Sequence, residues 1–233
     1  PTSVASLLYR TILLLVAILA VFSVGTLSSP KHLCRNDERA ALIRFNESLS
    51  INRSSSKDPS PQPKMTTWNA ADCCLWDGVE CDDLSGHIIG LDLSSSHLHG
   101  SINSNSTLFL LVHLQHLNLA DNDFNQSAIP SQIGLFQGLT LLNLSSSQFS
   151  GRIPSEITTL TKLTTLDLSR DPGDQSLTAG LKLQATDFQR LFKNMSSLVV
   201  IRLTLVKLSS PFPEVLESRS LTYLNLYGCG ISG

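Results

Sequence analysis

The chain has 233 residues, a formal net charge of −2 and only 15% charged residues. A charge balance this close to neutral gives no electrostatic basis for binding nucleic acid or an anionic membrane surface. Hydrophobic residues make up 42% of the chain, which is enough to build a core in one or two domains.

The amino-terminal segment has the pattern of a secretory signal peptide. Arg10 precedes an uncharged apolar run from Thr11 to Val24, and small residues follow in the sequence GTLSS. A membrane anchor is the alternative, but the run is shorter than the roughly 20 apolar residues that a spanning helix needs. We therefore expect residues 1–28 to be a signal peptide that directs the chain into the secretory pathway.

Six Asn-x-Ser/Thr motifs agree with secretion, because this motif is the acceptor for N-glycosylation. The candidate glycosylation sites are Asn46, Asn52, Asn105, Asn125, Asn143 and Asn194.

The segment from Cys34 to Cys81 is not repetitive. Its first part, NDERAALIRFNESL, predicts an amphipathic helix with Leu42, Phe45 and Leu49 on one face and Asn36 or Asp37 as its cap. A polar loop rich in proline and serine follows. We expect residues 34–82 to form a domain that covers the first coil of the repeats described below.

Three of the five cysteines lie in the stretch DCCLWDGVEC, from Asp72 to Cys81. A zinc site would need a fourth ligand and a spacing such as C-x2-C, and a redox site would need C-x-x-C; neither pattern occurs. A bond between the adjacent Cys73 and Cys74 would strain the peptide between them. In an oxidising compartment, disulfides that include Cys34 are the remaining interpretation.

The pattern L-x-x-L-x-L organises the chain from residue 88 to residue 233. About six copies begin at Ile88, Leu114, Leu139, Leu163, Leu198 and Leu221. A period in the twenties with this pattern is the signature of leucine-rich repeats. The last two leucines of each copy are two apart, as inward-facing residues of a strand are. We therefore predict an α/β solenoid in which the strands form one parallel sheet and stacked coils share a core.

The copy that begins at Leu163 is longer than the others and extends to residue 197. Its sequence RDPGDQS predicts a turn-rich loop, and ATDFQRLFKNM predicts a short helix. Thr186 or Asp187 is the expected helix cap, and Phe188, Leu191 and Phe192 are expected to lie on its buried face.

Residues between the inward leucines should point out of the sheet and form columns across the repeats. Such a surface is the candidate for ligand binding, because solenoids bind partners on the extended face of the sheet. Tyr223 and Tyr227 are the best anchors, since aromatic residues dominate binding hot spots. A glycan on Asn143 would lie on the same face. The other candidate contacts are Asp92, His116, Asn118, Asp167, Arg202 and Asn225.

No signature of catalysis or of a cofactor was found in the sequence. Gly-rich phosphate loops, H-E-x-x-H and G-x-S-x-G are all absent, and no carboxylate pair accompanies the histidines. We expect a protein that is not an enzyme, with no cofactor and no metal site. The histidines expected at the surface are His97, His99, His113 and His116.

The second half of the repeats carries the pattern G-x-I-P, most clearly at Gly151, Ile153 and Pro154, and in part at Phe212 and Pro213. With this pattern the chain resembles the plant-type leucine-rich repeat family. The order of helix, W-N and C-C-x-W-x-G-V-x-C before the repeats is similar to the amino-terminal cap of plant leucine-rich repeat receptors and polygalacturonase-inhibitor-like proteins. The resemblance implies a superhelix with the parallel sheet on its concave side, and a second short strand at G-x-I-P.

The same resemblance implies two disulfides, Cys34–Cys73 and Cys74–Cys81, with Trp76 between them. It also implies a ladder position, usually Asn or Cys, that hydrogen-bonds neighbouring coils. That position is occupied here by Ser96, Asn122, Ser147, Asp171, Val206 and Cys229. Val206 cannot form such a bond, so we predict looser stacking near it. We expect the Cys229 thiol to be buried.

The resemblance further implies a receptor-like protein that acts in recognition at the plant cell surface, with a role in defence. Its partners would be a protein, peptide or glycan ligand and a co-receptor or adaptor kinase. Membrane attachment is expected only through a segment beyond residue 233. Two alternatives are a secreted inhibitor like those that bind fungal polygalacturonases, located in the apoplast, and the ectodomain of a receptor kinase. The last coil, within a repeat, is expected to expose Leu221, Leu224, Leu226 and Ile231, and to favour aggregation.

Overall fold

The structure is a computed structural model that describes residues 33–58, 63–173, 180–208 and 220–231. All of these belong to one compact unit that begins at Leu33. The expected signal peptide at residues 1–28 lies outside the described residues, as do Phe212 and Pro213.

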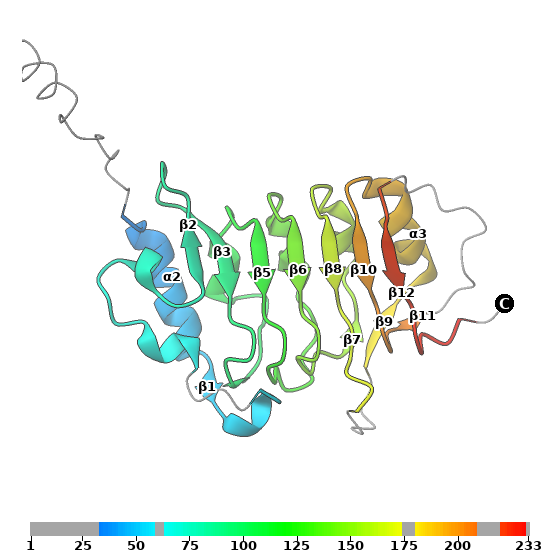
Figure 1. Ribbon diagram of the computed structural model, residues 1–233, viewed down its shortest axis with the longest axis horizontal. Helices are drawn as coiled ribbons and strands as arrows, with labels where there is room; N and C mark the ends of the chain where they lie inside the picture. Colours follow the sequence, from blue (N-terminus) through cyan, green and yellow to red (C-terminus); the bar gives the residue numbers. More distant parts are fainter. Residues whose placement is uncertain (1–32, 59–62, 174–179, 209–219, 232–233) are drawn as a thin grey trace, which may run out of the picture. The chain divides into compact units, whose positions relative to one another are not determined.

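Within the described residues, the main sheet has seven strands, in the order β12-β10-β8-β6-β5-β3-β2 (Figure 1). Every neighbouring pair is parallel except β2 and β3. This arrangement confirms the predicted parallel sheet and adds an antiparallel edge strand from the cap. The strands are β2 (Val79–Cys81), β3 (Ile88–Asp92), β5 (His116–Asn118), β6 (Leu141–Asn143), β8 (Thr165–Asp167), β10 (Val200–Arg202) and β12 (Tyr223–Asn225).

Two smaller sheets complete the coils. Strands β7 (Gly151–Arg152), β9 (Leu181–Leu183) and β11 (Lys207–Leu208) pair in parallel, with β9 in the middle. Strand β1 (Ser50–Ile51) of the cap pairs antiparallel with β4 (Leu98–His99) of the first coil. The second short strand implied at G-x-I-P is therefore present at Gly151.

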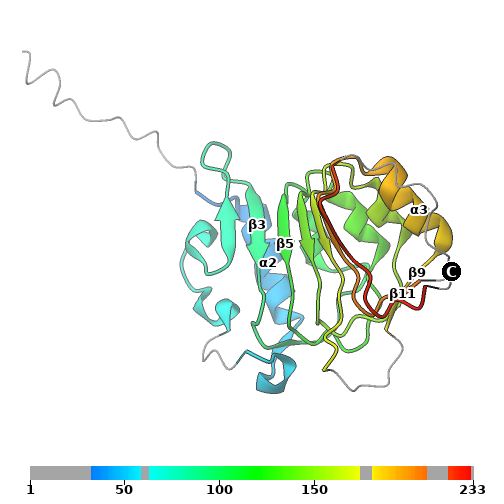
Figure 2. The ribbon, with the colours of Figure 1, turned by 45° about the vertical axis from the view of Figure 1, so that its right-hand side comes forward.

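Short 3₁₀ helices and one α-helix lie on the side of the coils opposite the main sheet (Figures 1 and 2). The 3₁₀ helices of the coils are η4 (Thr107–Leu110), η5 (Ser131–Leu135) and η6 (Ser155–Thr159). The α-helix is α3 (Ala185–Asn194), which packs against η6. Its buried residues include Phe188, Leu191 and Phe192, which confirms the predicted apolar face.

The core is a column of aliphatic side chains that runs through the stacked coils. Five residues that the register pairs across the strands are all at most 1% exposed: Leu91, Leu117, Leu142, Leu166 and Ile201. Burial of each contributes roughly 1.5–3 kcal/mol before chain entropy is subtracted. In the last coil the equivalent side chains are only half-buried; they are Leu221, Leu224, Leu226 and Ile231.

The cap consists of helix α2 (Asn36–Glu47) and the 3₁₀ helices η1 (Arg53–Ser55), η2 (Lys64–Thr67) and η3 (Cys73–Leu75). It contains the disulfides Cys34–Cys73 and Cys74–Cys81, the pairing that the resemblance implies. Trp76 is 3% exposed and stacks on Trp68 with ring centroids 5.1 Å apart.

Asp72, in the cysteine-rich stretch, has a structural role. Its Oδ1 atom accepts hydrogen bonds from the amides of Cys34 (3.0 Å) and Cys74 (3.1 Å). The Asp72 carboxylate thus positions the first cysteine of each disulfide, Cys34 and Cys74. These hydrogen bonds account for Asp72 without a metal ion.

Both predicted helix caps were wrong. The residue before α2 is Arg35 and the residue before α3 is Gln184, and neither makes a side-chain capping bond. Asn36 and Asp37 lie in the first turn of α2, and Thr186 and Asp187 lie in the first turn of α3. Acidic residues in the first turn interact favourably with the helix dipole without capping the helix. Each helix thus begins earlier than the sequence pattern predicted.

Asn122 shows what the ladder position does when it carries an amide. Its Nδ2 donates to the carbonyls of Leu93, Leu119 and Ala120, and its Oδ1 accepts from the amide of Leu98 at 2.9 Å. The buried Asn122 side chain thereby joins the backbone of its own coil to the backbone of the preceding coil.

The other ladder positions form fewer bonds. Ser147 donates to Leu119 O at 2.6 Å, and the buried Cys229 thiol lies 3.0 Å from Leu203 O. The assignment of Asp171 to the ladder was wrong: its side chain is a third exposed and accepts from Lys57 of the cap instead. The reason is the long insertion, which begins at this point of the coil.

Candidate ligand-binding face

The strand register produces the outward columns predicted from the repeats. His116, Leu141, Thr165, Val200 and Tyr223 are paired neighbours across β5, β6, β8, β10 and β12. A second column consists of Asp92, Asn118, Asn143, Asp167, Arg202 and Asn225. We call the surface formed by these columns and the residues two positions after the second column the sheet face.

The second column has a structural function that reduces its share in binding. In each case but one, a side-chain oxygen accepts a hydrogen bond from the amide two residues later, which closes the turn after the strand. The bonds are 2.9–3.2 Å long and are accepted by Asp92, Asn118, Asn143, Asp167 and Asn225. Arg202 is the exception, and its guanidinium remains available for other contacts.

The cap contributes charged residues to the amino-terminal end of the sheet face. Lys64 Nζ donates to Asp92 Oδ1 at 2.8 Å and to Ser94 Oγ at 3.3 Å. Burial raises the pKa of Asp92, but the hydrogen bonds from Lys64 and Ser94 outweigh it and hold the pKa below its ordinary value.

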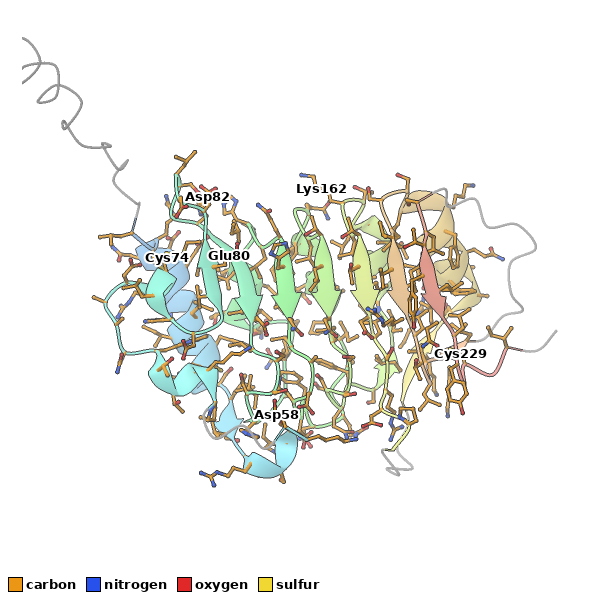
Figure 3. The ribbon with its side chains drawn as sticks, viewed as in Figure 1. Asp58, Cys74, Glu80, Asp82, Lys162 and Cys229 are labelled. Carbon is orange, nitrogen blue, oxygen red and sulfur yellow. A yellow bond between two sulfur atoms is a disulfide. The ribbon has the colours of Figure 1, made fainter. Side chains whose placement is uncertain are left out.

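Glu80 of β2 lies across this end of the face, and Figure 3 shows it at the edge of the main sheet. Its Oε2 is 3.4 Å from Nδ1 of His116. A Cβ atom on Gly90 would stand 2.7 Å from the same oxygen, so only a glycine at position 90 leaves space for the Glu80 side chain. These side chains border a shallow hollow of about 420 Å³ that is also lined by Asn118 and Leu141.

Three adjacent strands bring charged and aromatic side chains together at the other end of the face. Arg202 NH1 lies 3.9 Å from Asp167 Oδ2, and its guanidinium carbon lies 4.9 Å from the centre of the Tyr223 ring. Tyr223 is 45% exposed and Tyr227 is 69% exposed. Exposed rings of this size, with one held by a cation, are typical of binding hot spots.

Asn143 lies in the middle of the sheet face, between Asn118 and Asp167 in the register. Its Oδ1 accepts from the amide of Ser145, which leaves its Nδ2 as the atom that a glycan would modify. The six predicted glycosylation sites are all exposed or half-buried in the described residues. Glycosylation at each of them stays a prediction.

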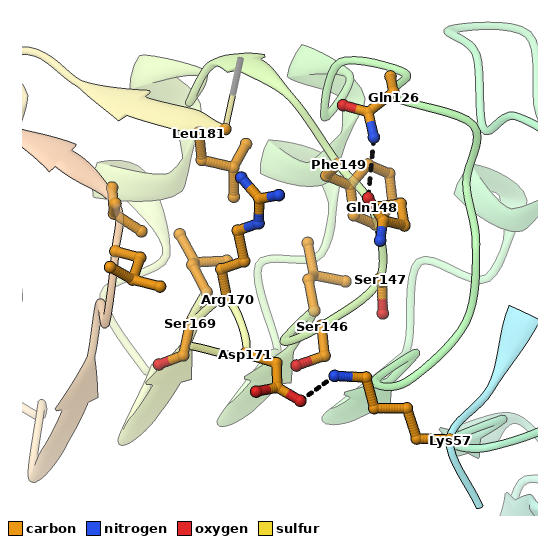
Figure 4. A pocket seen from close by; sticks show the side chains of 15 residues that line it. Lys57, Gln126, Ser146, Ser147, Gln148, Phe149, Ser169, Arg170, Asp171 and Leu181 are labelled. Atoms are coloured by element: carbon orange, nitrogen blue, oxygen red, sulfur yellow. Dashed lines mark hydrogen bonds and ion pairs between the residues drawn. The ribbon is translucent and has the colours of Figure 1, made fainter. Parts of the chain in front are cut away.

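A loop of the cap runs along one edge of the coils and closes a small cavity of about 40 Å³ (Figure 4). Lys57 forms an ion pair with Asp171, although the two are 114 residues apart in the chain. Gln126 donates to Gln148 at 2.8 Å on the far side of this cavity. A space of this size holds one or a few waters rather than an organic ligand.

The loop also explains why one histidine prediction was wrong. His97, expected at the surface, is only 4% exposed. Its carbonyl accepts from the amide of Asn52 at 2.7 Å, and the strand before Asn52 pairs with the strand after His97. The cap therefore covers this part of the first coil. His99, in contrast, is partly exposed and lies 3.1 Å from Asp123.

One predicted surface histidine, His113, has a partner that spacing did not reveal. It lies against His87 with ring centroids 3.7 Å apart, and His87 contacts the buried Glu38. In the described residues, two groups of metal-ligating side chains are close enough to share an ion. One consists of Cys34, Cys74 and Cys81, which are disulfide-bonded; the other consists of Glu38, His87 and His113.

The sequence prediction of the face missed Lys64 and Glu80. Both come from the cap, whose antiparallel pairing with β3 carries no repeat signal. The alternation in V-E-C, with Glu80 between two half-buried residues, was the one available indication of a strand there.

The comparisons with known proteins agree with this architecture. Residues 35–82 match the family described as Leucine rich repeat N-terminal domain, and residues 138–160 match the family Leucine Rich Repeat. Receptor-like protein 6 of Arabidopsis thaliana is 39% identical over 214 residues, which are 86% of this chain and 21% of that protein. The chain thus spans about a fifth of that relative's length.

Solved structures show the same fold. A plant ice-binding protein superposes with a TM-score of 0.61 at 25% identity, over 83% of this chain and 56% of that chain. The leucine-rich repeat ectodomain of the receptor kinase SOBIR1 from Arabidopsis thaliana gives a TM-score of 0.60 at 20% identity, over 84% and 94% of the two chains. Since proteins with such different names share it, the fold alone does not identify a ligand.

No helix in the described part of the chain is both long enough and apolar enough to span a bilayer.

Proposed function

Because the chain belongs to the plant leucine-rich repeat proteins of the receptor-like type, we propose that it is the amino-terminal part of a cell-surface receptor ectodomain. In this proposal the chain enters the secretory pathway, and a segment beyond residue 233 attaches the protein to the plasma membrane. The ligand is a protein or peptide, and recognition contributes to plant defence.

The observation that supports binding at the sheet face is the cluster of Arg202, Tyr223 and Tyr227. Arg202 and Tyr223 come from the adjacent strands β10 and β12, and Tyr227 lies in the turn after β12. Both rings are exposed even though Arg202 fixes that of Tyr223. Large exposed aromatics on a rigid sheet lose little conformational entropy on binding, which is why they suit a recognition surface. A receptor kinase ectodomain of the same fold, GASSHO1/SCHENGEN3 of Arabidopsis thaliana, was solved in complex with CASPARIAN STRIP INTEGRITY FACTOR 2.

The amino-terminal end of the face has a different chemistry. Most second-column side chains are engaged in turns, and Asp92 is paired with Lys64. Glu80 and His116 remain exposed there and border the hollow. We infer that this end supplies polar contacts that fix the position of the ligand along the sheet face, while the tyrosine end supplies most of the affinity.

The experiment compares the secreted chain with a Tyr223→Ala/Tyr227→Ala variant and with a Lys193→Ala control, in which the exposed residue lies on α3 away from the main sheet. Each protein is immobilised and exposed to peptides fractionated from plant apoplastic fluid. We expect the wild type and the control to retain the same peptide and the tyrosine variant to retain less than a tenth of it. Equal retention by all three would contradict binding at this face.

A direct assay separates the proposal from the inhibitor alternative. The secreted chain is added to a fungal polygalacturonase, and reducing sugar release from polygalacturonan is measured. We expect no change in rate. Saturable inhibition that is lost in the tyrosine variant would favour the secreted inhibitor instead.

A further inference from the structure

A cluster of three side chains joins the cap to the first two coils, on residues that the recognition proposal does not use. Glu38 comes from helix α2, His87 from the turn before β3, and His113 from the segment before β5. Ligand atoms of these three residues all lie within 4.8 Å of one another.

Glu38 is buried and fixed by two hydrogen bonds. Its side chain is 5% exposed; Oε2 accepts from the amide of Ile88 at 2.7 Å, and Oε1 is 2.9 Å from Nδ1 of His87. An ionised carboxylate only accepts hydrogen bonds, so the hydrogen of His87 must be on Nδ1. Nε2 of His87 then keeps its lone pair, which is the form that binds metal ions.

The second imidazole is close enough to act with the first. The rings of His87 and His113 are 3.7 Å apart at their centroids and inclined by 37°. The His87 side chain is 25% exposed and His113 is exposed, so an ion and its waters have access from solvent. Nitrogen ligands of one tetrahedral zinc ion stand roughly 3.3 Å apart at usual bond lengths, and rotation of the exposed His113 ring can provide that separation.

We propose that His87 and His113 bind a divalent transition-metal ion of the zinc class through their ring nitrogens, with Glu38 as the carboxylate that orients His87. A carboxylate behind a ligating histidine is the usual second partner in zinc sites, because it fixes the tautomer and raises the basicity of the ring. Water completes the coordination. This site departs from the expectation, drawn from spacing, that the chain has no metal site.

The location gives the ion a mechanical effect. His87 is attached to the cap through Glu38, while His113 precedes the strand of the next coil. An ion that bridges the two rings therefore stabilises the junction between the first two coils, and the contact of His87 with Glu38 couples this junction to the cap.

Elsewhere in the described part of the chain, the histidine–carboxylate pairs do not offer a second nitrogen. His116 faces Glu80 at 3.4 Å on the sheet face, and it belongs to neither group of clustered ligands in the described residues. It is therefore the matched control: an exposed histidine beside a carboxylate, but without a neighbouring ring at ligand distance.

The experiment is titration of the secreted chain with zinc chloride alone, followed by calorimetry. We expect one ion per chain for the wild type and for His116→Ala, and an affinity at least about 10-fold weaker for His113→Ala and for His87→Ala. Cobalt(II) provides a second readout, because coordination by nitrogen changes its visible absorption. No binding by the wild type, or equal binding by His113→Ala, overturns the proposal.

Thermal unfolding tests the bridge separately from the ion's affinity. Zinc should raise the unfolding temperature of the wild type and of His116→Ala, and leave that of His113→Ala unchanged. Because His113 is exposed, its replacement should preserve the fold, which circular dichroism checks. An equal rise in all three proteins would show that the ion does not bridge these rings.

Discussion

The guanidinium of Arg202 lies over the ring of Tyr223, 4.9 Å from its centre, while its NH1 atom faces Asp167 at 3.9 Å. Three adjacent strands thus contribute to one contact, in which Arg202 forms an ion pair with Asp167 and a cation–π interaction with Tyr223. The contact is exposed, so it contributes about 0.5–1 kcal/mol to stability at most. Its principal effect is to fix Tyr223 in one orientation before a ligand arrives.

Arg202→Ala should therefore affect binding far more than folding. We expect the free energy of unfolding to change by less than about 1 kcal/mol, because Arg202 and Tyr223 are nearly half exposed and Asp167 keeps its hydrogen bond from the Ser169 amide. Ligand retention should fall about 10-fold as Tyr223 becomes free to rotate. Chemical denaturation and the retention assay measure the two effects, and a large loss of stability would show that the contact is structural.

Asp187 in α3 gives an asymmetric prediction about charge burial. It is 1% exposed and faces Arg152 and Arg190, both at 3.2 Å, whose side chains are about half exposed. Removing both arginines leaves a buried, unpaired carboxylate and should cost roughly 3 kcal/mol.

Arg152→Ala alone should cost about 1 kcal/mol, because Arg190 still pairs with the carboxylate. Urea denaturation of the single and double variants tests the difference. If the double variant loses no more than the single one, solvent reaches Asp187 and the burial argument is wrong.

Alanine substitutions at Gly78 and Gly230 distinguish the cost of backbone strain from the cost of steric crowding. Their φ angles are +79° and +69°, so alanine is strained at both positions by about 1–2 kcal/mol. A Cβ atom at Gly78 would stand 2.1 Å from the carbonyl oxygen of Asp92, whereas nothing lies within 4 Å at Gly230.

Gly78→Ala should therefore destabilise the chain by about 3 kcal/mol or more, and Gly230→Ala by only the conformational part. Thermal unfolding of the two variants provides the comparison. Similar losses would mean that the cap strand moves away from β3 without cost.

Asp121 predicts how the cap loop responds to acid. Burial raises its pKa, but bonds from Ser56, the Lys57 amide, Ser95 and the Asp58 amide outweigh this and lower the pKa below 3.8. A carboxyl group with a depressed pKa stabilises the folded state above its unfolded pKa, and this contribution disappears as the pH falls through the folded pKa.

The loop should thus remain attached at neutral pH and detach only as the pH falls through the lowered folded pKa of Asp121. The amide chemical shift of Lys57 reports the contact, and Asp121→Asn is the control in which this acid transition should be absent. The same transition in the variant would assign it to another carboxylate.

The ladder predicts uneven stability along the coils. Asn122 is joined to neighbouring backbone by four bonds, whereas Val206 offers none from its side chain. Amides at 203–208 should exchange with deuterium faster than those at 119–124. Asn122→Ala should cost about 3 kcal/mol because buried backbone groups lose their partners. Equal exchange in the two segments would contradict the prediction.

The repeats were predictable because the residues that specify each strand lie close together in the sequence. Leucines two apart specify a strand with one buried face, and repetition at a fixed period specifies stacking, so the sheet and its outward columns followed from the sequence. The Asx bonds of Asn118 and Asn143 were also readable in principle, since Asn commonly closes a turn two residues ahead.

What was missed depends on contacts between distant segments. Lys57 reaches Asp171, Lys64 reaches Asp92, and Glu38 reaches His87. No spacing rule reports such contacts, because the path of the cap over the first coils is set by packing and disulfides. The burial of His97 and the grouping of the histidines around Glu38 have the same origin.

Photo-crosslinking tests directly whether the sheet face of this receptor-like chain binds a ligand. A benzophenone amino acid replaces Tyr227 in the full-length protein expressed in leaves, and in a second protein it replaces Lys193 on α3. We expect a saturable crosslink to one extracellular protein or peptide from position 227 and none from position 193. Crosslinks of equal yield from both positions, or from neither, would contradict ligand binding at this face.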